Sequence, residues 1–254
     1  MSGGGYCGAD MTAPTSSTAT AQTGPAFFAR TAAVPALSRG RFVFVGERLW
    51  LDFVNTEPVA HAGTLRQAVA LADVADGPPH AADALRDFDT FVAWLESAAV
   101  LDVERAQGIR RRALQQPTGA TATLVDARRV RSTLRVLAER GTNLSQVRFD
   151  ALSEINRVLG RSAGTRRVEL RSDGSYTRAF VPVGDAFAGL MIPIVESAAD
   201  AMILGELGRV RRCADSRCPR VFFDRTKNGR RRWCDMATCG NRAKAARHRA
   251  RRKN

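Results

Sequence analysis

Apolar residues recur three and four positions apart through the middle of this chain, which is the pattern of amphipathic helices. One such stripe holds Leu124, Val130, Leu134 and Leu137, and Gly141 follows it as a stop signal. The pattern predicts a mainly α fold. Helices are expected over residues 64–75, 82–99, 103–115, 121–139 and 149–159, and from about residue 185 to residue 207.

Two stretches depart from this helical pattern. Residues 166–170 and 176–182 alternate around a Ser-Asp-Gly-Ser turn, which predicts a small β-hairpin on the helical domain. In the last helix we expect Pro193 to cause a kink or an interruption, because proline removes a backbone donor. The side chains expected to be buried in the second and last helices are Leu85, Phe88, Val92 and Leu95, and Ile194, Val195, Ala198, Met202 and Ile203.

Residues 41–57 are dense in aromatic and aliphatic side chains, so we expect this segment to be buried. Asp52, Asn55 and Thr56 are polar residues inside it, and a buried polar group must be hydrogen-bonded. One interpretation is that Asp52 and Asn55 cap a helix or tie down a loop. The other is that the three residues line a ligand pocket.

The helix expected over residues 121–139 also carries several arginines. One interpretation is a solvated or salt-bridged face, with Asp126 and Glu139 available as partners. If the domain binds an acidic ligand, the candidates are Arg128, Arg131 and Arg135, because a guanidinium fork suits a carboxylate or a phosphate.

Residues 1–40 are low in complexity and rich in Gly, Ser, Thr, Ala and Pro, so they are expected to be disordered. They lack the apolar core of a signal peptide, and no stretch of the chain approaches the roughly 18 apolar residues of a membrane span. A cytoplasmic protein is therefore expected. Translation could start at either Met1 or Met11, and we assign no role to Cys7.

The end of the chain holds two cysteine pairs, Cys213 with Cys218 and Cys234 with Cys239. Each pair encloses four residues and fifteen separate the pairs, a spacing typical of zinc ligands. Four thiolates give zinc a closed tetrahedral shell, which stabilises a fold and leaves no position for substrate. We expect one structural Zn²⁺; two disulfides or four unrelated thiols are the alternatives.

The sequence between and after these pairs predicts the form of a finger. An Asn-Gly turn at 228–229 lies between an apolar run at 219–225 and a short run at 230–233, which predicts a hairpin. A helix should follow Cys239, with Ala243, Ala246 and Ala250 on one stripe that packs on the hairpin. The whole predicts a treble-clef-like zinc finger at residues 209–254, after a helical domain at residues 41–208.

The net charge of +14 lies entirely in this finger. Residues 209–254 hold 17 Lys and Arg against three Asp, whereas residues 1–208 hold 22 charges of each sign. A polyanion is the expected partner, because each phosphate contact releases condensed counterions. A solvated basic tail is the alternative.

Two motifs carry a resemblance to known families. Cys239-Gly240-Asn241-Arg242, with the upstream cysteine pair, resembles the CGNR zinc finger of bacterial transcription regulators. Residues 51–56, Leu-Asp-Phe-Val-Asn-Thr, resemble the hallmark of the ABATE domain, the helical partner that usually precedes such fingers. The resemblance implies a stress-linked regulatory domain over about residues 41–200, and it names no ligand.

The leading hypothesis is therefore a transcription regulator whose finger binds DNA while the helical domain senses a small molecule or mediates assembly. The connector at 208–212 is too short for a free tether, so the finger's orientation should follow the helical domain. Asn241 could cap a helix or the turn before it, or could bind a base. The expected contact residues are Arg230, Arg231, Arg232, Asn241, Arg242, Lys244, Arg247, Arg249, Arg251 and Arg252.

Two other functional classes are compatible with a basic, cysteine-rich chain end. RNA or ribosome association is the rival, although the helix after Cys239 has no aromatic residue for base stacking. A His-metal nuclease is less compatible with the sequence, because the only histidines are His61, His80 and His248, and the cysteine site is closed. Oligomeric state, operator and sign of regulation stay open.

Overall fold

The computed structural model describes residues 38–39, 42–57, 83–170, 174, 176–184 and 187–252. The expected disordered segment before residue 38, Cys7, and the helix expected over residues 64–75 lie outside this part of the chain. In the described part, the first regular elements are a short antiparallel pair, β1 (Ser38–Arg39) and β2 (Phe42–Val43), slightly before the expected boundary at residue 41.

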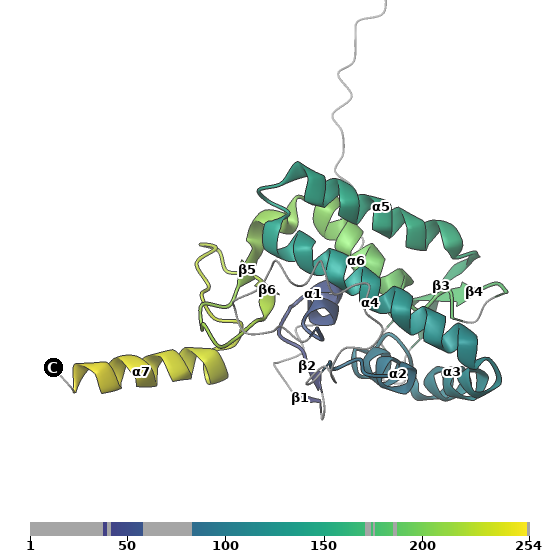
Figure 1. Ribbon diagram of the computed structural model, residues 1–254, viewed down its shortest axis with the longest axis horizontal. Coiled ribbons are helices and arrows are strands. Elements are labelled where there is room, and N and C mark those ends of the chain that lie inside the picture. Colours follow the sequence, from purple (N-terminus) through teal and green to yellow (C-terminus); the bar gives the residue numbers. More distant parts are fainter. Residues whose placement is uncertain are drawn as a thin grey trace, which may run out of the picture. The chain divides into compact units, whose positions relative to one another are not determined.

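The described part is mainly helical, as expected (Figure 1). Its helices are α1 (Leu49–Val54), α2 (Phe88–Ser97), α3 (Val103–Gln115), α4 (Pro117–Arg140), α5 (Ser145–Arg161) and α6 (Ile192–Ile203), followed by the C-terminal α7 (Asn241–Arg251). None of the helices in the described ranges is long and apolar enough to cross a membrane.

One hydrophobic core joins α1, α2, α4, α5 and α6. Trp50, Leu51, Phe53 and Val54 of α1 are fully buried, as expected for this aromatic-rich run. The stripe Leu124, Val130, Leu134 and Leu137 of α4 is also buried. Hydrophobic periodicity therefore identified the inner faces correctly.

Several helix ends differ from the expected ones. α2 begins at Phe88 rather than residue 82, because Asp87 caps it by accepting from the Thr90 backbone N–H. α5 begins at Ser145 rather than residue 149 and continues through Gly160, because a glycine weakens a helix without ending it. Pro193 lies in the first turn of α6, where its missing N–H costs nothing, so it begins that helix instead of kinking it.

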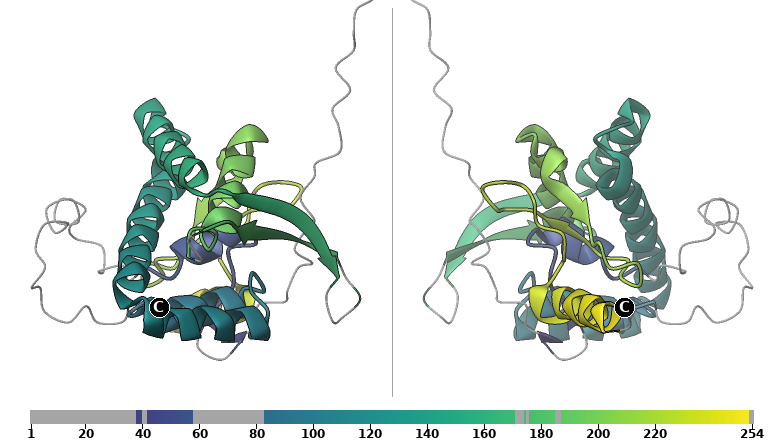
Figure 2. Two further views of the ribbon diagram at one scale, coloured as in Figure 1. Left: turned by 90° about the vertical axis from the view of Figure 1, so that its right-hand side faces the viewer. Right: turned by 90° about the vertical axis from the view of Figure 1, so that its left-hand side faces the viewer.

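The last expected helix, from about residue 185 to residue 207, is shorter at both ends, because α6 begins only at Ile192. α6 ends at Ile203, Gly205 adopts a left-handed conformation at φ 66°, and a 3₁₀ turn η2 (Glu206–Arg209) follows. Ile203 was expected to be buried and is 79% exposed, so that prediction was wrong. The expected hairpin forms from β3 (Gly164–Leu170) and β4 (Tyr176–Pro182), and it is long and curved in Figure 2.

The finger contains a hairpin plus a helix, as expected, but its hairpin uses different strands. β5 (Val210–Arg212) pairs antiparallel with β6 (Val221–Phe223), so the first cysteine pair lies in the loop between them. Residues 230–233 form no strand. The carboxylate of Asp224 accepts from the Arg231 backbone N–H at 2.8 Å, and the Ala214 N–H donates to the Arg232 carbonyl at 2.8 Å, which directs this segment away from β6.

Candidate metal centre and basic surface

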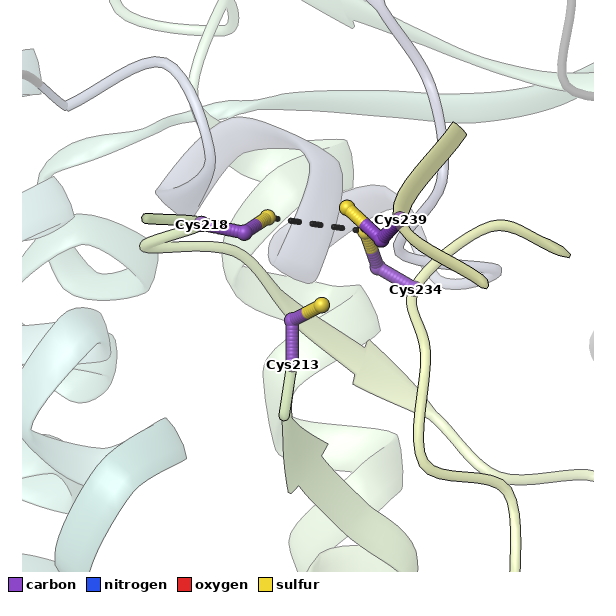
Figure 3. A group of neighbouring side chains, drawn as sticks. All are labelled: Cys213, Cys218, Cys234 and Cys239. Atoms are coloured by element: carbon purple, nitrogen blue, oxygen red, sulfur yellow. Dashed lines mark hydrogen bonds between the residues drawn. The ribbon is translucent and has the colours of Figure 1, made fainter. Parts of the chain in front are cut away.

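The four cysteine sulfurs of the finger converge on one point (Figure 3). All four lie within 4.8 Å of one another, with Cys218 and Cys234 sulfurs 3.6 Å apart and Cys234 and Cys239 sulfurs 3.7 Å apart. Zn–S bonds of about 2.3 Å in a tetrahedron place sulfurs about 3.8 Å apart, whereas a disulfide needs about 2.05 Å. The cysteines are free and buried, so they fit one Zn²⁺ and exclude the disulfide alternative.

Two tight turns position these ligands. Cys213 directly follows β5, and its N–H donates to the Arg220 carbonyl at 2.9 Å, while the Cys218 N–H donates to the Asp215 carbonyl at 2.8 Å. On the other side Cys239 lies in η3 (Met236–Gly240), a π-helical turn capped by the carboxylate of Asp235. The metal would therefore join the hairpin loop to the turn that begins α7.

Crowding of four thiols perturbs their acidities. A hydrogen bond with Cys234 lowers the pKa of Cys218 to about 5, and the same bond raises the pKa of Cys234 above its usual range. Burial raises the pKa of Cys213. Without a cation the cluster cannot hold four negative sulfurs, so the charge of a divalent metal is what the donor set requires.

The surroundings of the sulfurs complete the centre. Arg242 donates from Nη2 to the Cys239 sulfur at 3.0 Å, and its Nε lies 3.0 Å from Asp215 Oδ2. The hydrogen bond to Cys239 raises the pKa of Arg242. Phe222 and Val45 pack around the sulfurs, with Trp233 half-buried beside them. The metal-binding motif thus includes an arginine that supports a ligand.

The expected nucleic-acid contacts divide into two groups. Arg231 is tied into the finger through the carbonyls of Trp233 and Cys234 and an ion pair with Glu47, and Arg242 faces Cys239. Asn241 donates to the Ala237 carbonyl at 3.1 Å, which is the contact of a residue capping the preceding turn. Within the described ranges, no acidic partner lies within 4 Å of Arg230, Arg232, Lys244, Arg247, Arg249, Arg251 or Arg252.

Helix α7 carries most of the second group and has no buried residue. Ala246 and Ala250 are exposed and Ala243 is half-buried, so the expected packing of an alanine stripe on the hairpin was wrong. The helix instead leads away from the helical core in Figure 1. Its basic side chains, including His248, are therefore accessible from most directions.

The finger is held on the helical domain by a docking surface made of Gly46, Glu47, Arg48 and Asn55 against Val221 and Phe223. The Asn55 side chain donates to the Val221 carbonyl and accepts from the Val221 N–H, both at 2.9 Å. The Phe223 N–H donates to the Gly46 carbonyl at 3.0 Å. Asn55 thus satisfies both backbone groups of a residue that is fully buried.

Alternation along β6 gives the docking surface its apolar component. Val221 and Phe223 belong to the core of the helical domain, whereas Phe222 between them packs on the cysteine cluster. Successive side chains of a strand point to opposite faces, so one short strand joins the two cores. The Arg48 guanidinium lies 3.8 Å from the centre of the Phe223 ring and also pairs with Glu206 at 2.8 Å.

Glu47 adds charge to this surface. Its carboxylate pairs with Arg231 and lies 2.9 Å from Nε of Arg225. The backbone of Glu47 is left-handed at φ 60°, a conformation that costs a residue with a side chain roughly 1 kcal/mol or more. Beside it, a Cβ on Gly46 would lie 2.7 Å from the Asp52 nitrogen, so glycine is required for this close approach.

The residues proposed for a ligand pocket are paired with other groups of the protein. Asp52 accepts from the Gly46 N–H at 2.7 Å, which ties down the docking loop, and Arg131 donates to Thr56 and to both oxygens of Asp83. Arg135 lies 3.4 Å from Glu57 and 3.7 Å from Glu139, and Arg128 donates to the Leu85 and Arg86 carbonyls. Ligand binding by these residues stays a prediction.

Burial affects the pKa values of three of these groups, Asp52, Asp83 and Arg135, with different net results. Burial raises the pKa of Asp52 to about 7. Burial also acts to raise the pKa of Asp83, but hydrogen bonds from Arg131 hold it below its ordinary value. Burial lowers the pKa of Arg135 despite the nearby Glu139 and Glu57.

Together these features define a mainly helical protein that carries a four-cysteine zinc finger. Comparison with family models agrees: the CGNR zinc finger matches residues 209–252, and ABATE, described as "putative stress-induced transcription regulator", matches residues 47–205. The chain belongs to the ABATE family and ends in a CGNR zinc finger. A comparison with curated proteins found no match.

Proposed function

We propose that this protein is a DNA-binding transcription regulator whose contact element is α7 together with the loop at residues 225–232. The observation that supports this most is the exposure of every basic side chain on α7, with no acid in the helix to neutralise them. The like charges along this helix repel one another, and an isolated helix of eleven residues is only marginally stable in water. Bound phosphates would neutralise the repulsion between these charges and stabilise the helix.

Fewer residues are proposed to contact DNA than the sequence alone suggested. Arg231 and Arg242 serve the docking surface and the metal centre, so they are assigned to holding the finger together. Arg230, Arg232, Lys244, Arg247, Arg249, Arg251 and Arg252 are the proposed phosphate and base contacts. Each phosphate contact adds about 0.9 to the slope of log affinity against log salt.

The test is a salt series with fluorescently labelled duplex DNA. Changing Arg247, Arg249 and Arg251 together to Gln should reduce the magnitude of the log–log slope by about 2–3, as three lost contacts require. The matched control changes Arg111, Arg140 and Arg161 to Gln, three exposed arginines of the helical domain, and should leave the slope unchanged. Equal slopes for the two triple variants would rule out α7 as the contact element.

RNA is the alternative polymer, since arginine–phosphate contacts serve either. A structured RNA hairpin run through the same salt series separates the two possibilities. Tighter binding of the hairpin than of the duplex at every salt concentration would move the proposal to an RNA-associated role.

We further propose that the helical domain senses a ligand or mediates assembly and controls the finger through the docking surface. The support is physical continuity: β6 contributes to both cores, and Asn55 and Glu47 from the helical side contact the finger. Changing Glu47 to Gln would free Arg225, which is 60% exposed, to meet a phosphate. The salt slope should then steepen by about 1, and an unchanged slope would argue against this control.

A further inference from the structure

A cavity of about 410 Å³ lies between α3, β4 and the beginning of α6, well away from the cysteine centre in sequence. Its wall is mostly apolar and includes Leu101, Ile109, Phe180 and Leu190. Cavities of this size and composition are typical of small-molecule sites. We propose that this cavity binds a small carboxylic acid with an aromatic or branched apolar body.

Two arginines supply the charge that selects an acid. Arg105 and Arg112 are seven residues apart on α3, so they lie two turns apart on the same side of the helix, and both line the cavity. Arg105 is held in position by Glu169 and by the Phe180 carbonyl, each at 3.2 Å. Arg112 has no acidic group within 4 Å among the residues that the structure describes, so its guanidinium is available to a carboxylate.

Gly108 provides an independent argument. It lies in the interior of α3 and lines the cavity, and glycine there weakens a helix relative to alanine. Packing does not require it, because a Cβ at this position would meet nothing closer than Arg111 Nη2 at 3.9 Å. The bare backbone instead leaves open space between Arg105 and Arg112, where the body of a ligand would lie.

The position of the cavity suits a sensing site, and in this respect the inference rests on the proposed function. Leu190 and Pro193 line the cavity at the start of α6. This helix packs on α1, which leads to Asn55, and Ser197 of α6 accepts from the Trp50 N–H at 3.4 Å. After α6 the chain passes through η2 and β5 directly to Cys213. A ligand here would contact the helix that connects to both sides of the docking surface.

Thermal-shift and calorimetric titration of the full zinc-loaded chain test the proposal. The probes are benzoate, 1-naphthoate and 4-methylpentanoate, each compared with its neutral alcohol. At least one acid should bind at a single site, and its alcohol should bind about tenfold more weakly, as expected from loss of one charge-assisted hydrogen bond. The absence of binding by all three acids overturns the proposal.

Variants locate the site. Arg112→Gln should reduce acid affinity about tenfold without changing alcohol affinity, and Gly108→Leu should abolish binding of both by filling the cavity. Arg161→Gln, an exposed arginine of α5, is the charge-matched control and should bind like the unaltered chain. Binding that survives in both Arg112→Gln and Gly108→Leu overturns the proposal.

The duplex-DNA assay on the same samples keeps this inference separate from the proposed function. Gly108→Leu should keep the DNA affinity of the unaltered chain and should melt at the same or a higher temperature, because the open space above Gly108 accepts a side chain without a clash and leucine favours a helix more than glycine does. If the acids bind but DNA does not, the cavity is a ligand site and the DNA-binding proposal fails. If DNA binds but none of the acids does, the ligand-site proposal fails and the DNA-binding proposal stands.

Discussion

Asn55 is the residue on which docking of the finger depends most. Its amide makes two hydrogen bonds of 2.9 Å to the backbone of Val221, whose side chain is completely buried. Changing Asn55 to Ala removes both partners at once. The N–H and carbonyl of Val221 then remain inside the protein without a hydrogen bond.

The magnitude follows from this accounting. An unsatisfied buried polar group costs about 1–3 kcal/mol, so the loss of two partners in Asn55→Ala should lower the free energy of unfolding by about 2–6 kcal/mol. The measurement is urea unfolding of the full chain with zinc present throughout, followed by circular dichroism. Hydrogen exchange at Val221 and Phe223 should accelerate in the same variant, because these amides lose their protection when β6 leaves the helical domain.

Asn143→Ala is the matched control, because Asn143 is an exposed residue in the turn between α4 and α5. Its stability should stay within about 0.5 kcal/mol of the unaltered chain, as is usual for surface changes. If Asn55→Ala were as stable as Asn143→Ala, water or a rearranged loop would be satisfying Val221. The docking surface would then not hold the finger.

Two further predictions concern groups near the docking surface and the metal. The pKa of Asp52 is raised from 3.8 to about 7, so the fold favours its neutral form, and its contribution to stability is full below about pH 4 and lost as the pH rises through 7. Between pH 5 and pH 8 the free energy of unfolding, measured in urea, should fall by about 2–3 kcal/mol more in the unaltered chain than in Asp52→Asn. Parallel pH profiles of the two proteins would contradict the raised pKa of Asp52. Arg242→Gln should release zinc to a colorimetric chelator about 10–100-fold more readily than Arg249→Gln, because only Arg242 supports a ligand sulfur; equal release would argue against that role.

Local patterns in the sequence predicted much of the fold. The inner faces of α2 and α4 follow from helical periodicity, and the β3–β4 hairpin follows from alternation around a short polar turn. The metal centre was predictable because the spacing of Cys213, Cys218, Cys234 and Cys239 is itself a signature. These features depend on residues near one another in the chain.

The docking surface could not be predicted in this way, since Asn55 and Val221 are 166 residues apart. The sequence showed only that a polar residue inside an apolar run needs a partner. It could not show that the partner is the backbone of a strand in the finger. The strand pairing was missed for a related reason: the Asn228-Gly229 turn is a strong local signal, but Asp224 takes the N–H that a second strand would need.

The same limit applies to the basic residues. Judged by charge alone, Arg231 and Arg242 were as good candidates for nucleic-acid contacts as Arg247 or Arg249. Only the fold separates arginines that hold the finger together from those that remain free to meet a phosphate. Glu47, which was not singled out in the sequence, makes part of that distinction by pairing with Arg231.

The central claim is that one zinc ion held by four cysteines gives the finger its shape. Elemental analysis of the purified full chain tests this claim most directly. We expect about one zinc per chain, and we expect Cys234→Ser to lose the metal together with hydrogen-exchange protection across residues 210–223. A metal-free chain whose finger remains fully protected would contradict the claim.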